Sequence, residues 1–204
     1  MTLPYLGMML PALRTTRLLL RPWRSEDRDA LAAMNADPRV MEYFPKTMTL
    51  EESQAMFDRF HAHVDEHGFG IWAVEIPGVA ACAGFLGLWR PKFVTHFTPC
   101  VEMGWRLAAA HWNRGYATEG AKAAMTYGFE SLALDELVAF TAVENVRSRR
   151  VMERLYSCEA ELVHSDYRSA FVEIASRITL DLLCMVAADT PNQSAISSAV
   201  RCGS

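Results

Sequence analysis

The sequence predicts an α/β (α+β) fold built on one mixed β-sheet. Segments with strand and helix patterns follow one another in the order β-α-α-β-β-β-α-β-α over residues 17–155. The three consecutive strands indicate an antiparallel meander. The strand, helix, strand and helix that end this region indicate a parallel crossover beside it. With 204 residues, of which 51% are hydrophobic, the chain can bury a substantial core.

The first half of this pattern holds one strand and two helices. An apolar run over Arg17–Trp23 predicts the first strand. Ser25 is typical of a helix N-cap, and the helix that it begins should end at Pro38. A second helix is predicted from Thr49, because Thr49-Leu-Glu-Glu is a capping-box pattern, and it should end at Gly68.

The second half holds the remaining strands and helices. Proline and glycine divide apolar runs that have the length of strands, and two stretches have helical spacing of their apolar residues. The predicted strands are Phe69–Ile76, Ala81–Trp89, Pro99–Leu107 and Glu136–Val143, and the predicted helices are Thr118–Leu132 and Asn145–Leu155.

Composition excludes several classes of protein. The net charge of −4 and a pI near 5.9 argue against an electrostatic nucleic-acid binder. No apolar run approaches the roughly 20 residues that a bilayer-spanning helix needs, so no membrane partner is expected. The five cysteines are scattered without a CxxC pair, which favours reduced thiols in a cytoplasmic protein over a disulfide framework or a zinc site.

The most informative stretch joins the predicted strand at Pro99–Leu107 to the helix after it. Its sequence, His-Trp-Asn-Arg-Gly-Tyr-Ala-Thr-Glu over 111–119, places glycine and small residues directly before a helix. Backbone N–H groups and the positive helix end would point to one place there, which suits a phosphate, and Arg114 adds positive charge. The alternative is an ordinary turn in which Gly115 takes a positive φ.

This stretch resembles a known family. Trp112-x-x-Gly115-x-Ala117 resembles the [Q/R]-x-x-G-x-[G/A] acetyl-CoA motif of the GNAT acyltransferase superfamily, and Trp-Asn-Arg-Gly-Tyr-Ala-Thr-Glu resembles its RimJ/RimL-like branch. An aromatic residue at Trp112 is usual in that branch, whereas Asn113 stands where the branch often has glycine. The resemblance covers residues 14–155 and includes Leu18–Trp23, Gly84–Leu88, Glu102–Trp105 and Asn145–Leu155.

The resemblance implies a GNAT-like fold whose fourth and fifth strands splay apart to admit acetyl-CoA, with no metal. The 112–118 loop would bind the pyrophosphate by backbone N–H groups, backbone groups around Leu107 would bind the pantetheine and polarise the thioester carbonyl, and Asn145 would contact the pantetheine arm. The implied acetyl-CoA-binding residues are Leu107, Trp112, Asn113, Arg114, Gly115, Tyr116, Ala117, Thr118 and Asn145.

The resemblance also implies direct acetyl transfer to an amine acceptor in a ternary complex. The amine must be neutral to attack a thioester, and Glu102 is the candidate base, acting through a water. The alternative for Glu102 is a solvated strand residue or an ion-pair partner. Ser148 matches the position that protonates the departing thiolate in part of the branch, although a serine there can instead satisfy a helix-start N–H. Met152 stands where many relatives have a tyrosine and cannot donate a proton.

The resemblance ends after Leu155. We therefore expect a leader over 1–13, an acyltransferase core over 14–156 and a divergent segment over 157–204, with a disordered tail from about 187. One alternative function follows: an impaired or non-catalytic acetyl-CoA-binding protein whose last strands have been replaced. The apolar stretch Phe171–Leu182 is the candidate for one replacement strand.

A remote alternative is a zinc peptidase. His63-Val-Asp-Glu-His67 matches an H-x-x-E-H pattern, and residues four apart share one helix face. A polar helix C-terminus explains the same residues, because histidine complements the helix dipole. The sequence leaves the acceptor amine unnamed, a peptide N-terminus or a small molecule, and allows a monomer or a homodimer.

Overall fold

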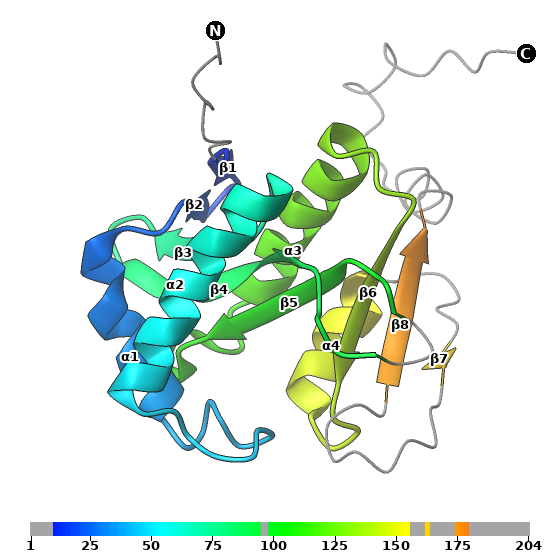
Figure 1. The fold of residues 1–204 in the computed structure, drawn as a ribbon. Helices are drawn as coiled ribbons and strands as arrows, with labels where there is room; N and C mark the ends of the chain where they lie inside the picture. The colour runs from blue at the N-terminus through cyan, green and yellow to red at the C-terminus, as the bar shows by residue number, and fades with distance from the viewer. Residues whose placement is uncertain (1–9, 95–97, 156–161, 164–173, 180–204) are drawn as a thin grey trace, which may run out of the picture.

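The computed structural model describes residues 10–94, 98–155, 162–163 and 174–179. Within these residues, one sheet has the strand order β1-β2-β3-β4-β5-β6-β8-β7 (Figure 1). The pairs from β1 to β5 are antiparallel, β5 and β6 are parallel, and β8 is antiparallel to both of its neighbours. The strands are β1 (Leu13–Arg14), β2 (Leu19–Arg21), β3 (Ile71–Ile76), β4 (Ala80–Trp89), β5 (Glu102–Leu107), β6 (Glu136–Thr141), β7 (Leu162–Val163) and β8 (Ile174–Thr179).

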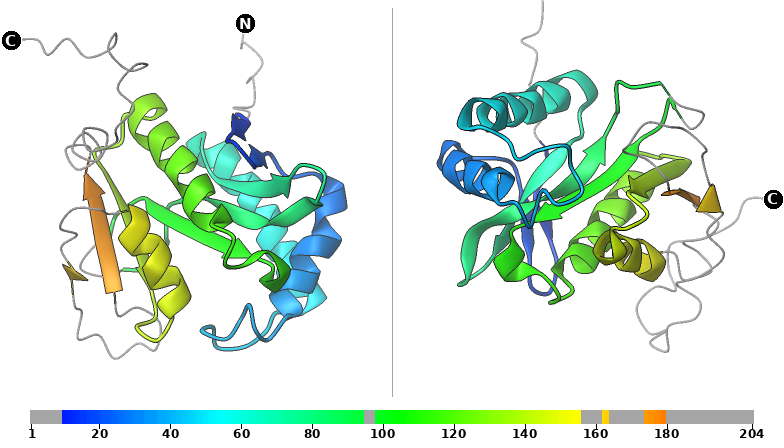
Figure 2. Two further views of the ribbon diagram at one scale, coloured as in Figure 1. Left: turned by 180° about the vertical axis from the view of Figure 1, so that it is seen from behind. Right: turned by 90° about the horizontal axis from the view of Figure 1, so that it is seen from below.

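Helices cover both faces of the sheet. Helices α1 and α2 lie on one face, and α3 and α4 lie together on the other (Figures 1 and 2). None of the helices in the described ranges is long and apolar enough to cross a membrane. Their bounds are α1 (Arg28–Ala36), α2 (Leu50–His67), α3 (Tyr116–Thr126) and α4 (Val146–Leu155), and a π-helical turn, Tyr127–Ser131, continues α3.

Strand β3 shows why both faces are needed. Successive side chains of a strand point to opposite faces, and in β3 both sets are buried. Trp72 and Val74 belong to one apolar cluster with α3 and α4, whereas Ile71 and Ala73 belong to another with α1 and α2. Central strands that are buried on both sides have nearly continuous apolar sequences, and this one reads Ile-Trp-Ala-Val-Glu-Ile.

The predicted helix ends are partly confirmed. Thr49 and Glu52 form the reciprocal capping box at the start of α2, and Gly68 ends that helix with a φ of 75°. The prediction of Ser25 as an N-cap is wrong. Ser25 begins a short 3-10 turn, and the side chain of Asp27 instead accepts the backbone N–H of Arg24 at 2.8 Å.

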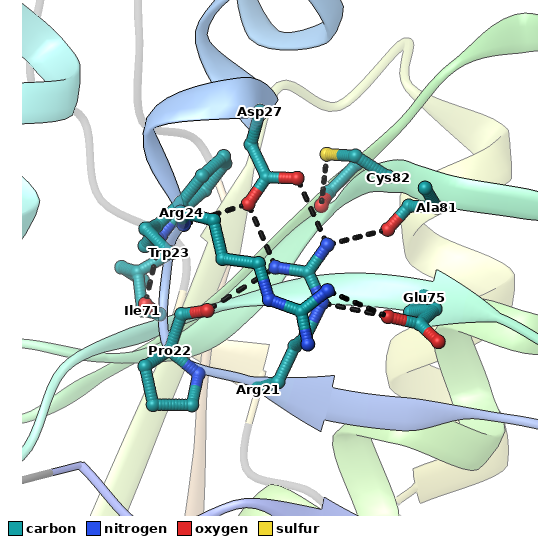
Figure 3. A network of polar contacts seen from close by, with 10 residues as sticks. Arg21, Pro22, Trp23, Arg24, Asp27, Ile71, Glu75, Ala81 and Cys82 are labelled. Atoms are coloured by element: carbon teal, nitrogen blue, oxygen red, sulfur yellow. Dashed lines mark hydrogen bonds and ion pairs between the residues drawn. The ribbon is translucent and has the colours of Figure 1, made fainter.

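The buried side chain of Arg21 holds Asp27 in this position (Figure 3). Arg21 donates from Nη1 and Nη2 to the two carboxylate oxygens of Asp27 at 2.7 and 2.8 Å, and from Nε to Glu75 at 2.7 Å. Its Nη2 also donates to the carbonyl oxygen of Ala81. A buried guanidinium is stable when its charge is paired and its donors are used. Arg21 thereby joins β2 to β3, to β4 and to the turn before α1.

The fourth and fifth predicted strands splay apart, as expected. They are β5 and β6 here, because β1 was not predicted from the sequence. Strand β4 pairs with β5 from Glu102 to Leu107, whereas β5 and β6 share one bridging pair, Glu102 with Val138. From that pair the two strands separate toward their carboxyl ends (Figure 1), which leaves one edge of β5 open.

The sheet continues beyond β6. Strand β8 pairs with β6 at six positions, from Glu136 with Thr179 to Thr141 with Ile174, and β7 pairs with β8. The prediction of a strand within Phe171–Leu182 is therefore confirmed. Leu13, the last residue of the predicted leader, pairs with Leu20 in the sheet. Residues 1–9 of that leader and the predicted tail from about 187 lie outside the described residues.

Candidate active site

The splay opens into a pocket of about 520 Å³. Its walls are β5, the loop that leads into α3, the end of β6, the first turns of α4 and the loop between α1 and α2. All but one of the residues predicted for the site line it: Glu102, Leu107, Trp112, Asn113, Gly115, Tyr116, Ala117, Thr118, Asn145 and Ser148. The exception is Arg114, whose side chain is exposed and is not among the lining residues.

Two left-handed residues shape the loop before α3. Asn113 has a φ of 59° and Gly115 a φ of 79°. Asparagine tolerates this conformation better than most residues, so Asn113 can take the left-handed φ that glycine would otherwise be expected to provide. A Cβ at Gly115 would lie 3.3 Å from Nη2 of Arg17. The positive φ therefore favours glycine at position 115, and an added Cβ would also require the end of the Arg17 side chain to shift slightly.

The start of α3 presents donors that its own helix cannot use. Its first i→i−4 bond runs from Glu119 N–H to the carbonyl oxygen of Gly115, so the N–H groups of residues 116–118 precede it. The cap, Gly115, has no side chain. Within the described chain, the hydroxyl of Thr118 is the buried polar side-chain atom that lacks a hydrogen-bond partner. These donors suit an anion.

Arg17 and Glu119 hold this loop in place. Arg17 donates to Glu119 Oε2 at 2.6 Å and to the carbonyl oxygen of Arg114 at 2.8 Å, and Thr15 donates to Glu119 Oε1 at 2.6 Å. Burial alone would raise the pKa of Glu119, but these hydrogen bonds outweigh burial and lower it. Arg114 thus contributes its backbone to the loop. Neither Arg17 nor Glu119 is predicted from the sequence as a residue of the site.

Trp112 connects the loop to β5. Its indole Nε1 donates to the carbonyl oxygen of Leu107 at 2.7 Å, so one lone pair of that carbonyl is already used. The guanidinium of Arg147 lies 4.5 Å from the centre of a Trp112 ring and forms an ion pair with Glu42. Three walls of the pocket meet at this tryptophan.

Glu102 lies in the wall where β5 and β6 meet. The residue is half-buried, and burial raises the pKa of its carboxyl group to about 7. Among the described residues, no hydrogen bond or ion pair is made by this carboxylate. The structure therefore gives no support to the alternative of an ion-pair partner. A carboxyl group that titrates near neutral pH beside a cavity is suited to proton transfer.

Asn145 and Ser148 stand at the start of α4. Oδ1 of Asn145 accepts the backbone N–H of Ser148 at 3.1 Å, so Asn145 is the residue that caps this helix. The cap seen at the start of this helix is therefore Asn145, and Ser148 lines the pocket. Met152 is buried in the core at 3% exposure, away from any role in proton transfer.

The histidines at the end of α2 do not form the suspected zinc site. Nδ1 of His63 lies 2.9 Å from the carbonyl oxygen of Phe69, and its Nε2 accepts the N–H of Arg90 at 3.0 Å. Burial lowers the pKa of His63 to about 4, so the ring is neutral. Both ring nitrogens serve the backbone, and the described residues contain no group of three or more candidate metal ligands.

A comparison with protein families agrees with this geometry. The family described as the acetyltransferase (GNAT) domain matches residues 17–155. The chain belongs to the GNAT acetyltransferase family. It is accordingly an acyltransferase, and its mixed sheet with a splay between β5 and β6 is the fold expected from the resemblance.

Individual relatives support this assignment. The chain is 32% identical over 154 residues to the FsC-acetyl coenzyme A-N(2)-transacetylase of Aspergillus fumigatus, a match that spans 70% of this chain and 63% of that protein. It is 30% identical over 166 residues to the uncharacterised N-acetyltransferase p20 of Bacillus licheniformis, covering 79% of this chain and 89% of that one. The crystal structure of an acetyltransferase from Agrobacterium tumefaciens superposes with a TM-score of 0.71 at 30% identity, covering 87% and 98% of the two chains.

Proposed function

We propose that this GNAT acetyltransferase uses acetyl-CoA and transfers the acetyl group to a primary amine, by direct transfer in a ternary complex. The observation that carries the proposal is the Thr118 hydroxyl, which has no hydrogen-bond partner among the described residues, beside the N–H groups of residues 116–118, which precede the first i→i−4 bond of α3. These donors lie at the mouth of a splay that is open to a pocket. A pyrophosphate supplies the oxygen acceptors that they lack.

Different residues of the chain would bind different parts of acetyl-CoA. Backbone N–H groups of residues 116–118 and the Thr118 hydroxyl would bind the pyrophosphate, with Asn113 and Gly115 giving the loop its shape. The free edge of β5 up to Leu107 and the amide nitrogen of Asn145 would bind the pantetheine arm, and Trp112 would fix the loop against β5. Acetyl-CoA supplies an activated acyl group whose thioester C–S bond breaks as the new N–C bond forms.

Two side chains would assist the chemical step, Glu102 as the base and Ser148 as a hydrogen-bond donor to the leaving group. Above its pKa of about 7, the Glu102 carboxylate accepts a proton from the ammonium form of the acceptor, directly or through a water. This leaves the lone pair that attack requires. The hydroxyl of Ser148 donates a hydrogen bond to the departing sulfur. The departing thiolate takes the proton that the nitrogen loses as the amide forms, and Glu102 then releases its own proton to solvent, so the protons balance.

Further properties of the enzyme are expected from its sequence. The enzyme would be RimJ/RimL-like, cytoplasmic, independent of metal, and a monomer or homodimer. Its acceptor would be a peptide N-terminus or a small-molecule amine. The name of the Aspergillus fumigatus relative, which describes transfer from acetyl coenzyme A to a nitrogen, supports the choice of donor.

Calorimetric titration of the purified chain tests the donor. We expect acetyl-CoA to bind with micromolar affinity, and acetyl-pantetheine, which lacks the pyrophosphate, to bind at least about tenfold more weakly. Equal affinity for the two ligands, or no binding of acetyl-CoA by the folded protein, would overturn the proposal. Binding without acetylation of any amine would favour the non-catalytic alternative.

A matched pair of glycine variants localises the binding. Gly115 and Gly78 have nearly equal φ values of 79° and 74°, but Gly78 lies in the β3–β4 turn with nothing within 4 Å of an added Cβ. Both Gly115→Ala and Gly78→Ala should lower the free energy of unfolding by about 1–2 kcal/mol. Only Gly115→Ala should also weaken acetyl-CoA binding, by about tenfold.

A further inference from the structure

Alternate residues of β5 place an arginine on the same face as the proposed base. Glu102, Gly104 and Arg106 are two residues apart, so their side-chain positions lie on one face of the strand. That face is the α1 and α2 side, because Arg106 contacts Asn35 of α1. Gly104 presents no side chain between the other two residues, and all three line the pocket.

Arg106 is held in position by neutral groups. Its Nη1 donates to Oδ1 of Asn35 at 2.8 Å, and its guanidinium carbon lies 4.3 and 5.1 Å from the ring centres of Phe44 and Phe85. Asn35 is fully buried and donates in turn to the hydroxyl of Ser53. The anchor of the guanidinium is therefore rigid and uncharged.

Arg106 is partly buried, and no described residue supplies the counter-charge that a guanidinium in such a place ordinarily has. A guanidinium carries five N–H donors, and within the described chain Arg106 uses one of them and forms no ion pair. Burial lowers the pKa of Arg106 to about 10, which still leaves it cationic at neutral pH. The contrast with Arg21 is direct, because Arg21 pairs with both Asp27 and Glu75.

The other arginines of the pocket differ from Arg106 in exposure. Arg39, Arg147, Arg150 and Arg154 are exposed, and the first two are paired with Asp37 and Glu42. Water and neighbouring carboxylates therefore compensate much of their charge. Only Arg106, among the described arginines that line the pocket, combines partial burial with the absence of an anion.

We propose that the acceptor amine also carries a carboxylate, and that Arg106 binds this carboxylate while the amine lies over Gly104 toward Glu102. The planar fork of a guanidinium matches a carboxylate with two parallel hydrogen bonds. The inference rests on the proposed acetyl-CoA-dependent function and names the substrate class: amino acids and acidic peptides. Polyamines are disfavoured, because five arginines and one carboxylate line the described pocket.

Paired acceptors test this inference. Each pair is a carboxylate-bearing amine and its carboxamide. The amines are α-amino acids, ω-amino acids of increasing chain length and acidic dipeptides. Spermidine is the polycationic control. Acetylated products are measured by mass spectrometry at saturating acetyl-CoA. We expect kcat/KM for the best carboxylate-bearing amine to exceed that of its amide by at least about tenfold.

Arg106→Gln should bring the ratio of kcat/KM for the carboxylate-bearing amine to kcat/KM for its amide close to one. Arg106→Lys, which retains the charge, should restore part of this ratio. Arg39→Gln is the matched control, because Arg39 lines the same pocket but already has a carboxylate partner. It should leave the ratio unchanged. Calorimetry should give every variant the acetyl-CoA affinity of the wild type, which shows that the variant is folded and that Arg106 does not serve the donor.

The outcomes separate the two proposals. If the wild type does not bind acetyl-CoA, the proposed function fails first. Suppose that it binds acetyl-CoA but acetylates amides or spermidine at the same rate as carboxylate-bearing amines, or acetylates none of the carboxylate-bearing amines. In either case the assignment of Arg106 is overturned and the acetyl-CoA site stands. An unchanged ratio in Arg106→Gln overturns it as well.

Discussion

The indole nitrogen of Trp112 donates a hydrogen bond of 2.7 Å to the carbonyl oxygen of Leu107. This bond ties the first residue of the loop before α3 to the last residue of β5. Because β5 is not paired with β6 at this end, the bond helps to fix the mouth of the splay. Arg147 lies over the same indole and pairs with Glu42, which brings α4 and the α1–α2 loop to the same point.

Trp112→Phe should therefore weaken acetyl-CoA binding. The substitution keeps an aromatic ring under Arg147 but removes the donor to Leu107, and one hydrogen bond contributes about 1 kcal/mol, or roughly fivefold in the dissociation constant. Calorimetry measures the change. Trp23→Phe is the matched control, because Trp23 donates to the carbonyl oxygen of Ile71 at 3.0 Å outside the pocket. That variant should lose stability and keep its affinity, and an equal loss of affinity in both variants would contradict the assigned role.

Thr118→Val should change stability and binding in opposite directions. The hydroxyl of Thr118 is buried without a partner among the described residues, which costs about 1–3 kcal/mol, and valine has the same shape without that cost. The free variant should therefore unfold at the same or a higher temperature than the wild type. With the hydroxyl gone, its dissociation constant for acetyl-CoA should rise by about tenfold.

Thr15→Val is the contrasting control for this prediction. The hydroxyl of Thr15 donates to Glu119 at 2.6 Å and accepts the N–H of Leu18 at 2.9 Å. Its removal leaves both groups without that partner, so this variant should unfold at a lower temperature. A lower melting temperature for Thr118→Val in the absence of ligand would mean that the Thr118 hydroxyl serves the free fold instead of a ligand.

The sequence was sufficient for local features and insufficient for contacts between distant segments. The capping box at Thr49 and the loop glycine at 115 depend on neighbouring residues, and the structure has both as predicted. Ser25 failed as a cap because Asp27 is held by Arg21, from another strand. Strand β1 was not predicted because a strand of two residues is too short to show an alternation of apolar and polar side chains. Only its backbone pairing with β2 identifies it as a strand.

The site shows the same division. The pocket contains most residues of the contiguous motif at 111–119, with Arg114 and Glu119 as the exceptions. Arg17 and Glu119 are 102 residues apart in the chain and could not be paired from one sequence. Arg106 did have a local signal. The alternation Glu-Met-Gly-Trp-Arg-Leu places it on the face of Glu102, but the lack of an anionic partner for it among the described residues is visible only in three dimensions.

Asp27→Asn should lower stability strongly at neutral pH. Removing one partner of a buried ion pair leaves Arg21 without its bidentate acceptor, which costs about 3–5 kcal/mol. Burial alone would raise the pKa of Asp27, but hydrogen bonds from Arg21 and Arg24 outweigh it and lower the pKa. The wild type therefore gains stability from this carboxylate above the unfolded pKa, about 3.9, and loses it as pH falls further.

Chemical denaturation between pH 3 and pH 8 measures that effect. The difference in unfolding free energy between the wild type and Asp27→Asn should be full at neutral pH and should shrink in the acid range. Asp58→Asn is the control, because Asp58 pairs with Arg28 on the surface and should cost little. A difference that is independent of pH would show that packing around Asp27, and not its charge, stabilises the fold.

Glu102→Gln should lower turnover and leave acetyl-CoA affinity unchanged. A general base contributes about 100-fold or more to the rate. In the wild type, kcat/KM should rise with pH through the pKa of about 7 that burial gives Glu102, because only the carboxylate accepts a proton. The variant should lose this step in the pH profile. An unchanged rate and profile would remove Glu102 as the base.

The raised pKa of Glu102 should also affect how the stability of the free protein depends on pH. Folded Glu102 keeps its proton up to a pH of about 7, whereas in the unfolded chain it loses the proton near its ordinary pKa of about 4.3. Between these values the folded state binds more protons, so wild-type stability falls as pH rises. Glu102→Gln, which is always neutral, should melt at the wild-type temperature at pH 4 and above it at pH 8. Glu130→Gln, at an exposed residue, should match the wild type at both. Equal melting of Glu102→Gln and wild type at pH 8 would mean that Glu102 ionises freely in the folded protein, and the step at pH 7 would then need another group.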